Sequence, residues 1–327
     1  MKTEIHSTFE DRDRSKAVDA AVVLLGKGEV VALPTETVYG LAADALDPIA
    51  VAKIFEAKGR PRFDPLIVHL PDRDWLERIV DVPNQDRGLI GKLSEEFWPG
   101  PFTVVLPKRD IVPEIVTAGL DTVAVRISAH SVFTEIVGAF GGALAAPSAN
   151  RFGRISPTTA KHVFDELNGL IPLIIDGGPT THGIESTIVA VRDGKIEILR
   201  RGPITSDQLS EFGKVETAAA TNKIAAPGQL PSHYSPKTPL RLVDNVKSFE
   251  STERCALLAW KPVKKDDRFI AVRNLSEKQD LREAAANLFR DLRELDQLGA
   301  DLIVAERVPD QGLGAAILDR LTRASHS

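Results

Sequence analysis

Residues 15–40 read SKAVDAAVVLLGKGEVVALPTETVYG, and this stretch contains one complete helix-to-strand unit of the predicted fold. Apolar residues recur with a helical period from Ser15 to Lys27, and Ser15 is a suitable N-cap for that helix. The short apolar run Glu29–Leu33 predicts a strand. A polar motif follows directly over residues 34–40. This order indicates an α/β fold with a ligand site at the end of the strand.

Helices and strands continue to mix along the chain to about residue 210. Further helices are predicted at residues 48–57 and 131–140, and further strands at 66–70, 102–106, 122–127, 143–146 and 173–175. Asp193-Gly194 is a strong hairpin turn signal between predicted strands at 186–191 and 195–199. Because some strands alternate with helices and others pair directly, we expect a twisted mixed open sheet with helices on its faces.

The segment Lys214–Lys237 has a different composition from the rest of the chain. It is rich in Ala, Thr, Ser and Pro and has no apolar period, which predicts a linker. Beyond it, strands are predicted at 240–243, 256–260, 269–272 and 302–305, and helices at 278–295 and 313–321. We therefore expect a main domain over residues 1–212, a linker over 213–238 and a small C-terminal α/β domain of Rossmann-like type over 239–327.

Composition and charge limit the class of protein. The chain has 327 residues, 43% of them hydrophobic, and a formal net charge of −5, as is usual for a folded soluble protein. The single cysteine, Cys255, excludes an internal disulfide and makes a cysteine-based zinc site improbable. The polar N-terminus and the lack of a long apolar run predict neither a secretion signal nor a membrane span. We expect a cytoplasmic protein that does not bind nucleic acid tightly.

Two polar clusters follow predicted elements in the first part of the chain. The motif at 34–40 places hydroxyls and a carboxylate at a strand end, although a polar turn would explain it equally well. Lys58-Gly59-Arg60-Pro61-Arg62 follows a helix that Gly59 would end. Because Pro61 favours an extended Arg60, Lys58 and Arg60 should point toward one spot, as a polyphosphate site requires. The preference of cations for helix C-termini is the alternative, and it explains three cations less well.

A third cluster, Pro147-Ser148-Ala149-Asn150, follows the buried run 142–146. Ser148 and Asn150 again have a spacing of two, and an Asx- or Ser-type turn is the alternative explanation. The sequence has no GxxxxGK[ST] phosphate loop, no GxGxxG after a strand and no GxSxG motif. A nucleotide site in this chain would therefore not be one of the common types.

These clusters belong to an ordered series of motifs. The series is PTETVYGL (34–41), KGRPRFDPLIVH (58–69), WPGPFT (98–103), TVAVR (122–126), APSAN (146–150), SPT (156–158), DGG (176–178), EST (185–187) and ILRRG (198–202). It resembles the threonylcarbamoyl-AMP synthase family, whose catalytic domain is called YrdC-like, over roughly residues 15–205. PSHYSPK (231–237) is similar to the linker of the long form of that family, which has an extra C-terminal domain.

The resemblance implies a reaction. L-threonine, bicarbonate or CO₂, and ATP would give threonylcarbamoyl-AMP and pyrophosphate, with Mg²⁺ accompanying the nucleotide. A separate transferase would then move the threonylcarbamoyl group to the adenosine beside the tRNA anticodon. Cations fixed near the phosphates would stabilise the negative charge that grows on the phosphoryl oxygens.

The resemblance also implies site residues, at the positions that match the family's motifs. The family's Lys-x-Arg and Ser-x-Asn tetrad corresponds to Lys58, Arg60, Ser148 and Asn150. The threonine pocket would involve Thr37, His69, Thr122, Arg126 and Ser186. The ATP contacts would involve Arg60, Asp64, Ser156, Arg200 and Tyr234. No protein ligand for a metal ion is implied.

Two positions depart from the family's pattern. Asp64 stands where the family more often has Asn, and a carboxylate beside a polyphosphate is repulsive unless it faces a ribose, an amine or the metal. Arg201 stands where the family often has Pro, which adds a cation. The carbamate and the product both decompose in water, so we expect the Pro-rich linker around Tyr234 to act as a closing lid.

Three alternatives are weighed against this interpretation. A non-catalytic RNA-binding module of the same fold would bind tRNA with a steep salt dependence, and the acidic net charge argues against it. Carbamoyl-transferring hydrogenase-maturation proteins have a related domain, but they carry zinc-type cysteine motifs and this chain has one cysteine. An inactive paralogue is disfavoured by the complete tetrad and the linker motif.

Overall fold

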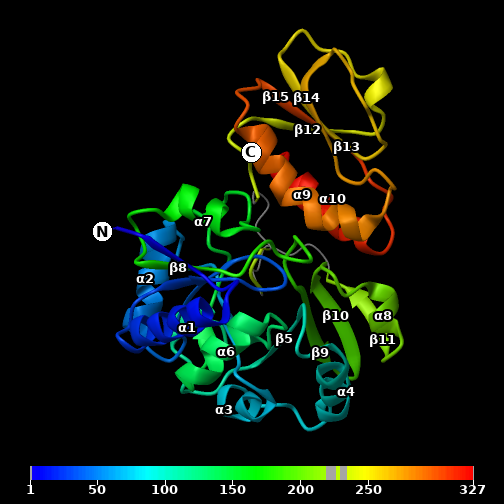
Figure 1. Ribbon diagram of the computed structural model, residues 1–327. Helices are drawn as coiled ribbons and strands as arrows, with labels where there is room; N and C mark the ends of the chain where they lie inside the picture. Colours follow the sequence, from blue (N-terminus) through cyan, green and yellow to red (C-terminus); the bar gives the residue numbers. More distant parts are fainter. Residues whose placement is uncertain (1, 219–225, 229–233, 327) are drawn as a thin grey trace. The chain divides into compact units, whose positions relative to one another are not determined.

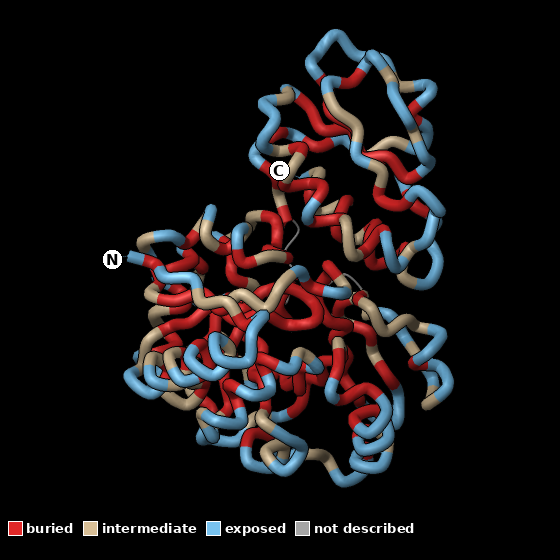
Figure 2. Tube along the Cα trace, in the orientation of Figure 1, coloured by how far each residue is buried: buried red, intermediate tan, exposed pale blue. Residues whose placement is uncertain are grey.

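The computed structural model describes residues 2–218, 226–228 and 234–326 (Figure 1). The chain divides into two compact units. The first unit comprises Met1–Phe152, Pro157–Thr180 and Glu185–Gln229, and the second comprises Gly153–Ser156, Thr181–Ile184 and Leu230–Ser327. In each unit the inner strands of the sheet are largely buried, and the exposed residues lie on helix surfaces, loops and the outer strands (Figure 2).

A mixed sheet is the framework of the first unit. Among the described residues it has eleven strands, in the order β1 (Glu4–Ser7), β8 (Leu173–Asp176), β2 (Val31–Leu33), β3 (Gly40–Asp44), β7 (Leu144–Ala145), β4 (Ile67–His69), β6 (Thr122–Arg126), β5 (Phe102–Pro107), β9 (Thr187–Arg192), β10 (Lys195–Arg200) and β11 (Lys214–Thr217). Parallel pairs such as β4–β6 and β5–β9 alternate with antiparallel pairs such as β5–β6 and β9–β10. The expected mixed sheet is confirmed.

Helices cover the two faces of this sheet unequally. On one face, α1 (Asp11–Gly26) and α6 (Ser131–Phe140) pack on β8, β2, β3 and β7. The other face packs against a longer series: α2 (Pro48–Lys58), α3 (Leu76–Ile79), α4 (Arg87–Phe97), α5 (Glu114–Thr117), α7 (Ala160–Leu167) and α8 (Ser206–Ser210). In the described part of the chain, the apolar core under α1 and α6 contains no residue of β6, β5 or β9.

Several predicted helices and turns are found with the capping and turn residues that the sequence indicated. Helix α6 spans the predicted residues, and α2 begins with Pro48 after an Asp47 side chain that accepts a hydrogen bond from the Ile49 amide. Gly59 ends α2 in the left-handed conformation, with φ of 61°. Asp193 and Gly194 both have positive φ, as a tight hairpin between β9 and β10 requires.

Two local predictions are corrected, and one strand is found that was not predicted. Helix α1 begins at Asp11, after an N-cap at Glu10, and not at Ser15. The apolar period could not predict this start, because the first turn of the helix is wholly polar. The motif at 34–40 is followed by strand β3, so it forms the connection of an antiparallel β2–β3 hairpin. Residues 214–217, placed in the linker, form strand β11 beside β10. Of the remaining predicted linker, residues 219–225 and 229–233 lie outside the described part of the chain.

The described residues of the second unit form a four-stranded parallel sheet, two α-helices and a short 3-10 helix, Val246–Ser248. The strand order is β12 (Leu240–Val243), β15 (Leu302–Glu306), β13 (Cys255–Ala259) and β14 (Phe269–Asn274), and the helices are α9 (Leu281–Asp296) and α10 (Leu313–Ala324). The expected small α/β domain is confirmed. Two short loops from earlier in the sequence, 153–156 and 181–184, also belong to this unit. No helix in the described ranges combines the length and the hydropathy needed to span a bilayer.

Candidate active site

The candidate site lies on the face of strands β4, β6, β5 and β9 that continues the α1/α6 side of the sheet. Ile67, Ala124, Val105 and Ile188 point to this face and form a small apolar cluster with Ala226. Because side chains alternate along a strand, the polar residues His69, Arg126, Thr103 and Ser186 point to the same side. We call this surface the site face; it is defined by these seven strand residues and Ser186, which directly precedes β9. It combines an apolar floor with buried polar groups at one end, as small-ligand sites do.

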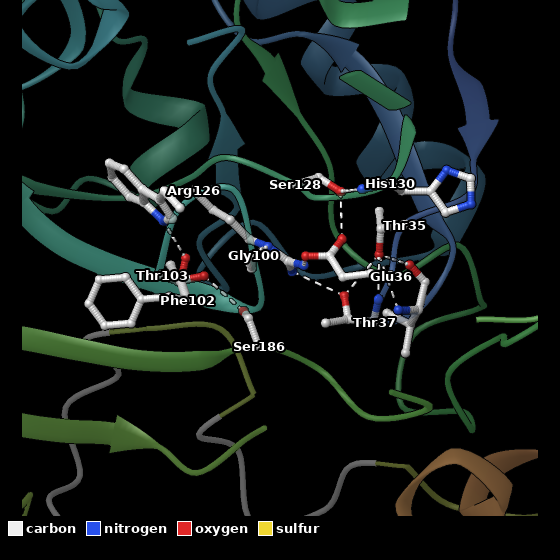
Figure 3. A network of polar contacts seen from close by, with 12 residues as sticks. Thr35, Glu36, Thr37, Gly100, Phe102, Thr103, Arg126, Ser128, His130 and Ser186 are labelled. Carbon is white, nitrogen blue, oxygen red and sulfur yellow. Dashed lines mark hydrogen bonds and ion pairs between the residues drawn. The ribbon is translucent and has the colours of Figure 1, made fainter. Parts of the chain in front are cut away.

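Arg126 organises the polar end of the site face (Figure 3). We call Arg126 and its neighbours Glu36, Thr37, Ser128 and His69 the Arg126 cluster. Its Nε donates to the Gly100 carbonyl at 3.1 Å, its Nη1 to the Thr37 hydroxyl at 3.0 Å and its Nη2 to Glu36 Oε1 at 2.5 Å. The second Glu36 oxygen accepts from Ser128 Oγ at 2.6 Å. The hairpin connection between β2 and β3 is thereby fixed to the end of β6.

The ionisation of Glu36 is well defined by these contacts. Burial acts to raise the pKa of its carboxyl, but the positive charge of Arg126 and the hydrogen bonds from Ser128 and Arg126 lower that pKa to about 2. Glu36 is therefore a carboxylate at neutral pH. The negative charge of Glu36 balances the positive charge of Arg126. The Arg126 guanidinium is also held in one orientation, so its N–H groups point in fixed directions.

His69 is the neutral member of this cluster. It ends β4 directly beside Arg126 of β6, and its ring centroid lies 4.8 Å from that of Phe133 in α6. Burial, and next the positive charge of Arg126, lower the pKa of His69 to about 3. Within the described residues its Nδ1 atom has no hydrogen-bond partner. His69 thus offers an uncharged ring nitrogen at the site.

Ser186 is hydrogen-bonded to both Thr103 and Arg200. The hydroxyls of Ser186 and Thr103 lie 2.8 Å apart, and Arg200 Nη2 donates to Ser186 Oγ at 3.0 Å. Arg200 Nη1 also donates to the Pro227 carbonyl at 3.3 Å. Pro227 and its neighbour Ala226 come from the predicted linker, and Ala226 packs on the apolar floor. At least this described part of the linker lies on the site face.

Lys58 is enclosed by the loop that contains the Ser-x-Asn pair. Its Nζ donates to the backbone carbonyls of Ser148 and Asn150, each at 2.5 Å, and the side chain is buried. Burial, and next the positive charge of Arg60, lower the pKa of Lys58 well below its usual value. The charges of Glu166 and Asp64 act in the opposite direction.

Arg60 points to a different set of partners from Lys58. Its Nη2 lies 2.8 Å from Asp64 Oδ2 and donates to the Pro65 carbonyl at 2.9 Å. Gly59 ends the helix in a left-handed conformation, so the alternation expected for an extended segment does not apply across it. The expectation that both cations point to one spot is corrected: they lie within electrostatic range of each other but bind separate groups.

Asp64 is the counter-ion of Arg60. It is fully buried, and burial raises the pKa of its carboxyl against the opposing charges of Arg60, Lys58 and Arg200. The carboxylate that departs from the family's pattern is therefore engaged by an arginine of the same loop. No group of three or more His, Cys, Asp or Glu side chains in the described residues is placed to hold a metal ion.

Two of the predicted ATP-contact residues lie in the second unit. Arg293 of α9 donates to the carbonyls of Ile155 and Ser156, and Ser156 is fully buried. Tyr234 stacks on Phe289 with ring centroids 5.4 Å apart, and the Arg320 guanidinium lies 5.2 Å from the Tyr234 ring centroid. Tyr234 has a positive φ of 65°. Both residues are held by helices of the second unit.

Comparison with known proteins identifies the family. The family model described as "Telomere recombination" matches residues 23–202, and the model described as "Threonylcarbamoyl-AMP synthase, C-terminal domain" matches residues 204–326. A threonylcarbamoyl-AMP synthase from Pyrococcus abyssi (strain GE5 / Orsay) is 37% identical over 93% of this chain and 93% of its own length. The chain belongs to the threonylcarbamoyl-AMP synthase family.

A second relative and a solved structure match almost the whole of this chain. The threonylcarbamoyl-AMP synthase of Bacillus subtilis (strain 168) is 38% identical over 99% of this chain and 98% of its own length. The crystal structure of P. abyssi Sua5 complexed with L-threonine matches 100% of this chain and 98% of that chain, with a TM-score of 0.90 and 35% identity. The similarity includes both the sheet domain and the C-terminal domain.

The structure brings together some of the residues that the synthase family's motifs indicated. Thr37, His69, Arg126 and Ser186 lie in or beside the Arg126 cluster. Thr122 starts β6, paired with Pro107 in the β5–β6 register, about 13 Å along the strand from Arg126 at the usual rise per residue. The predicted ATP set is divided: Arg60, Asp64 and Arg200 belong to the first unit, and Ser156 and Tyr234 to the second.

Three residues of the site, Glu36, Thr103 and Ser128, were not among those predicted from the sequence. Glu36 accepts from both Arg126 and Ser128, and the hydroxyls of Thr103 and Ser186 are hydrogen-bonded to each other. Glu36 and Thr103 do lie in the quoted motifs at 34–41 and 98–103. Ser128 follows Arg126 at a spacing of two, which was the available signal. Arg201, the second departure, has its Nη2 3.5 Å from the Thr217 hydroxyl of β11, so it contacts the sheet edge.

Proposed function

We propose that this protein is an L-threonylcarbamoyladenylate synthase, a nucleotidyltransferase that uses L-threonine, bicarbonate or CO₂, and ATP. The observation that carries the proposal is the similarity of both domains to threonylcarbamoyl-AMP synthases over nearly the full length of each chain. The crystal structure of P. abyssi Sua5, which matches the whole of this chain, is of a complex with L-threonine. The product would pass to a threonylcarbamoyl transferase that acts on tRNA.

The reaction needs two consecutive bond-forming steps. The threonine nitrogen attacks the carbon of CO₂ and loses a proton, which gives a carbamate. With bicarbonate, the C–O bond to the hydroxyl group also breaks, and the hydroxide leaves as water together with the proton from the nitrogen. A carbamate oxygen then attacks the α-phosphorus of ATP, and the bond from that phosphorus to the bridging oxygen of the β-phosphate breaks. Pyrophosphate leaves with the electron pair of that bond. The protein needs to supply position and charge stabilisation for these steps, with no covalent intermediate.

The Arg126 cluster is suited to the amino acid. A fixed guanidinium attracts a carboxylate, and hydroxyl groups such as those of Thr37 and Ser186 can orient a polar side chain. The ring of His69, whose pKa is lowered to about 3, adds a neutral polar atom beside them. The apolar floor below would accommodate the threonine methyl group. We propose that L-threonine binds against this end of the site face.

Arg60 and Lys58, with Arg200, would supply positive charge for the triphosphate. The positive charges of all three act to lower the pKa of Asp64, which supports a role in one region of positive charge. Mg²⁺ would enter with ATP as part of the substrate. An incoming polyphosphate would also favour the protonated form of Lys58.

Pyrophosphate release by the full chain tests this function. We expect release that requires both L-threonine and bicarbonate, and that is lost in Lys58→Ala and Arg60→Ala. Lys53→Ala is a matched control, because Lys53 lies on the same helix as Lys58 but pairs with Glu29 at 2.7 Å on the surface. Protein that leaves ATP intact under all conditions and binds tRNA with a steep salt dependence would instead support the RNA-binding alternative.

A further inference from the structure

The loop Pro147–Phe152, which we call the Asn150 loop, is built around the Lys58 side chain. Beyond the two carbonyls that accept from Lys58 Nζ, the Phe152 amide donates to the Lys58 carbonyl at 2.9 Å. On the opposite side, the Ala149 amide donates to the Tyr39 carbonyl at 2.7 Å. The positions of Ser148 and Asn150 are thus set by main-chain contacts with α2 and with the residue before β3.

One contact of the Asn150 loop comes from a charged side chain outside the family's motifs. The Arg151 amide donates to Glu166 Oε2 at 2.8 Å, and Glu166 lies near the C-terminal end of α7. Arg151 directly follows Asn150, so the Glu166 carboxylate restrains the Asn150 loop at the residue after Asn150. Unlike the main-chain contacts, it can be removed by substitution of one side chain.

We propose that Glu166 is a positioning residue of the synthase reaction, which holds the Asn150 loop around Lys58 and keeps a negative charge near the buried ammonium group. This inference rests on the proposed function. Glu166 acts through Lys58 and the loop, and it does not itself contact a substrate. It adds to the tetrad a fifth side chain, on a helix that none of the family's motifs includes.

The charges around Lys58 give the proposal a distinctive pH signature. Arg60 lowers the pKa of Lys58, whereas Glu166 and Asp64 raise it. Asp64 is itself held by Arg60 at 2.8 Å, so Glu166 is the negative charge that can be removed without freeing an arginine of the same loop. Loss of the Glu166 charge should make Lys58 lose its proton at lower pH.

Two substitutions separate the charge of Glu166 from its hydrogen bond. Glu166→Gln keeps an oxygen that can accept from the Arg151 amide but removes the charge, so the alkaline limb of the kcat profile should move to lower pH. Glu166→Ala removes both, and kcat at the pH optimum should also fall, by about tenfold for a lost charge-assisted hydrogen bond. The KM for L-threonine should change less than kcat, because the Arg126 cluster is untouched.

Asp165→Asn is the matched control. Asp165 is the preceding residue of α7 and pairs with Lys161 at 2.7 Å on the surface, so the variant removes the same charge from the same helix. Its kcat and pH profile should equal those of the wild type. If Glu166→Gln and Glu166→Ala both behave like Asp165→Asn, the inference is wrong. If Glu166→Ala does not fold, the profile of Glu166→Gln decides alone.

The wild-type protein separates this inference from the proposed function. A wild type without threonine-dependent and bicarbonate-dependent pyrophosphate release overturns the proposed function, and the inference with it. An active wild type whose Glu166 variants are unaffected overturns the inference alone.

Discussion

Glu36 and Arg126 form an ion pair that is almost completely removed from solvent. The two side chains are 8% and 3% exposed, and the Glu36 Oε1 and Arg126 Nη2 atoms lie 2.5 Å apart. Ser128 saturates the other carboxylate oxygen, and Thr37 and Gly100 accept from the remaining guanidinium nitrogens. A buried charge of this kind is tolerated only while its partner is present.

Glu36→Gln should therefore destabilise the first unit strongly. It leaves the Arg126 charge buried without a counter-charge, and we expect a loss of about 3 kcal/mol in the free energy of unfolding. Urea unfolding at neutral pH measures it. Glu135→Gln is the control: its pair with Arg14 is partly exposed, so a loss under about 1 kcal/mol is expected. Equal effects of the two substitutions would contradict the importance of the buried pair.

Acid should destabilise the protein through two groups of the site. The pKa of Glu36 is about 2 in the folded state against an ordinary 4.5, so its stabilisation is complete above that ordinary value and is lost as pH falls toward 2. The pKa of His69 is lowered from 6.5 to about 3, so below pH 6.5 the unfolded chain takes up a proton that the folded chain does not. Both effects make the folded state weaker in acid.

The His69 contribution can be isolated by substitution. Between about pH 6 and pH 4 the wild type should lose about 1.4 kcal/mol per pH unit more than His69→Asn does, because one proton separates the two states. Unfolding free energies at three or four pH values give both slopes. Parallel slopes would show that His69 gains a proton in the folded state as readily as in the unfolded one.

The sequence was sufficient where a local signal and the tertiary structure agree. Helix α6, the Asp193-Gly194 hairpin and the Gly59 end of α2 follow from period, turn residues and capping. The start of α1 and strand β11 were not found, because a polar first turn and an edge strand with one partner carry no apolar period. Strand β3 was missed because its buried residues directly follow a polar motif.

The same limit applies to the site. The family's motifs assigned Thr37, Arg126 and Ser186 to one predicted threonine pocket, and in the structure these residues lie at the same end of the sheet. The motifs could not show that the αL conformation of Gly59 directs Lys58 and Arg60 to different partners. Nor could they show that Glu166 contacts the Asn150 loop, since that contact spans 15 residues and follows no repeat.

Asp291→Asn should stabilise the second unit at neutral pH. Burial raises the pKa of the Asp291 carboxyl from 3.8 to about 6, so wild-type stability falls as pH rises from about 4 to 6. A neutral amide avoids this cost, and we expect a gain of about 2 kcal/mol at pH 7 in the hydrogen-exchange protection of α9. Glu294→Gln, which removes a half-exposed charge from the same helix, should change protection by under about 1 kcal/mol.

The loop 181–184 packs closely on helix α9 at Gly183. An ideal Cβ at Gly183 would lie 2.5 Å from the Ala286 Cα atom and would also overlap the Ala285 carbonyl oxygen. Gly299 of the same unit has nearly the same φ, +67° against +69°, but nothing lies within 4 Å of its Cβ position. Both Gly→Ala variants carry the backbone strain of a positive φ, about 1 kcal/mol.

Only Gly183→Ala should also force the loop away from α9. We expect it to be less stable than Gly299→Ala by a further 1–3 kcal/mol or so, the usual cost of overpacking. Hydrogen exchange should locate the added loss in the amides of α9 near Ala285 and Ala286, because displacement of the loop exposes that part of the helix. If both variants lose the same stability and α9 keeps its protection, the loop is not packed on the helix in solution.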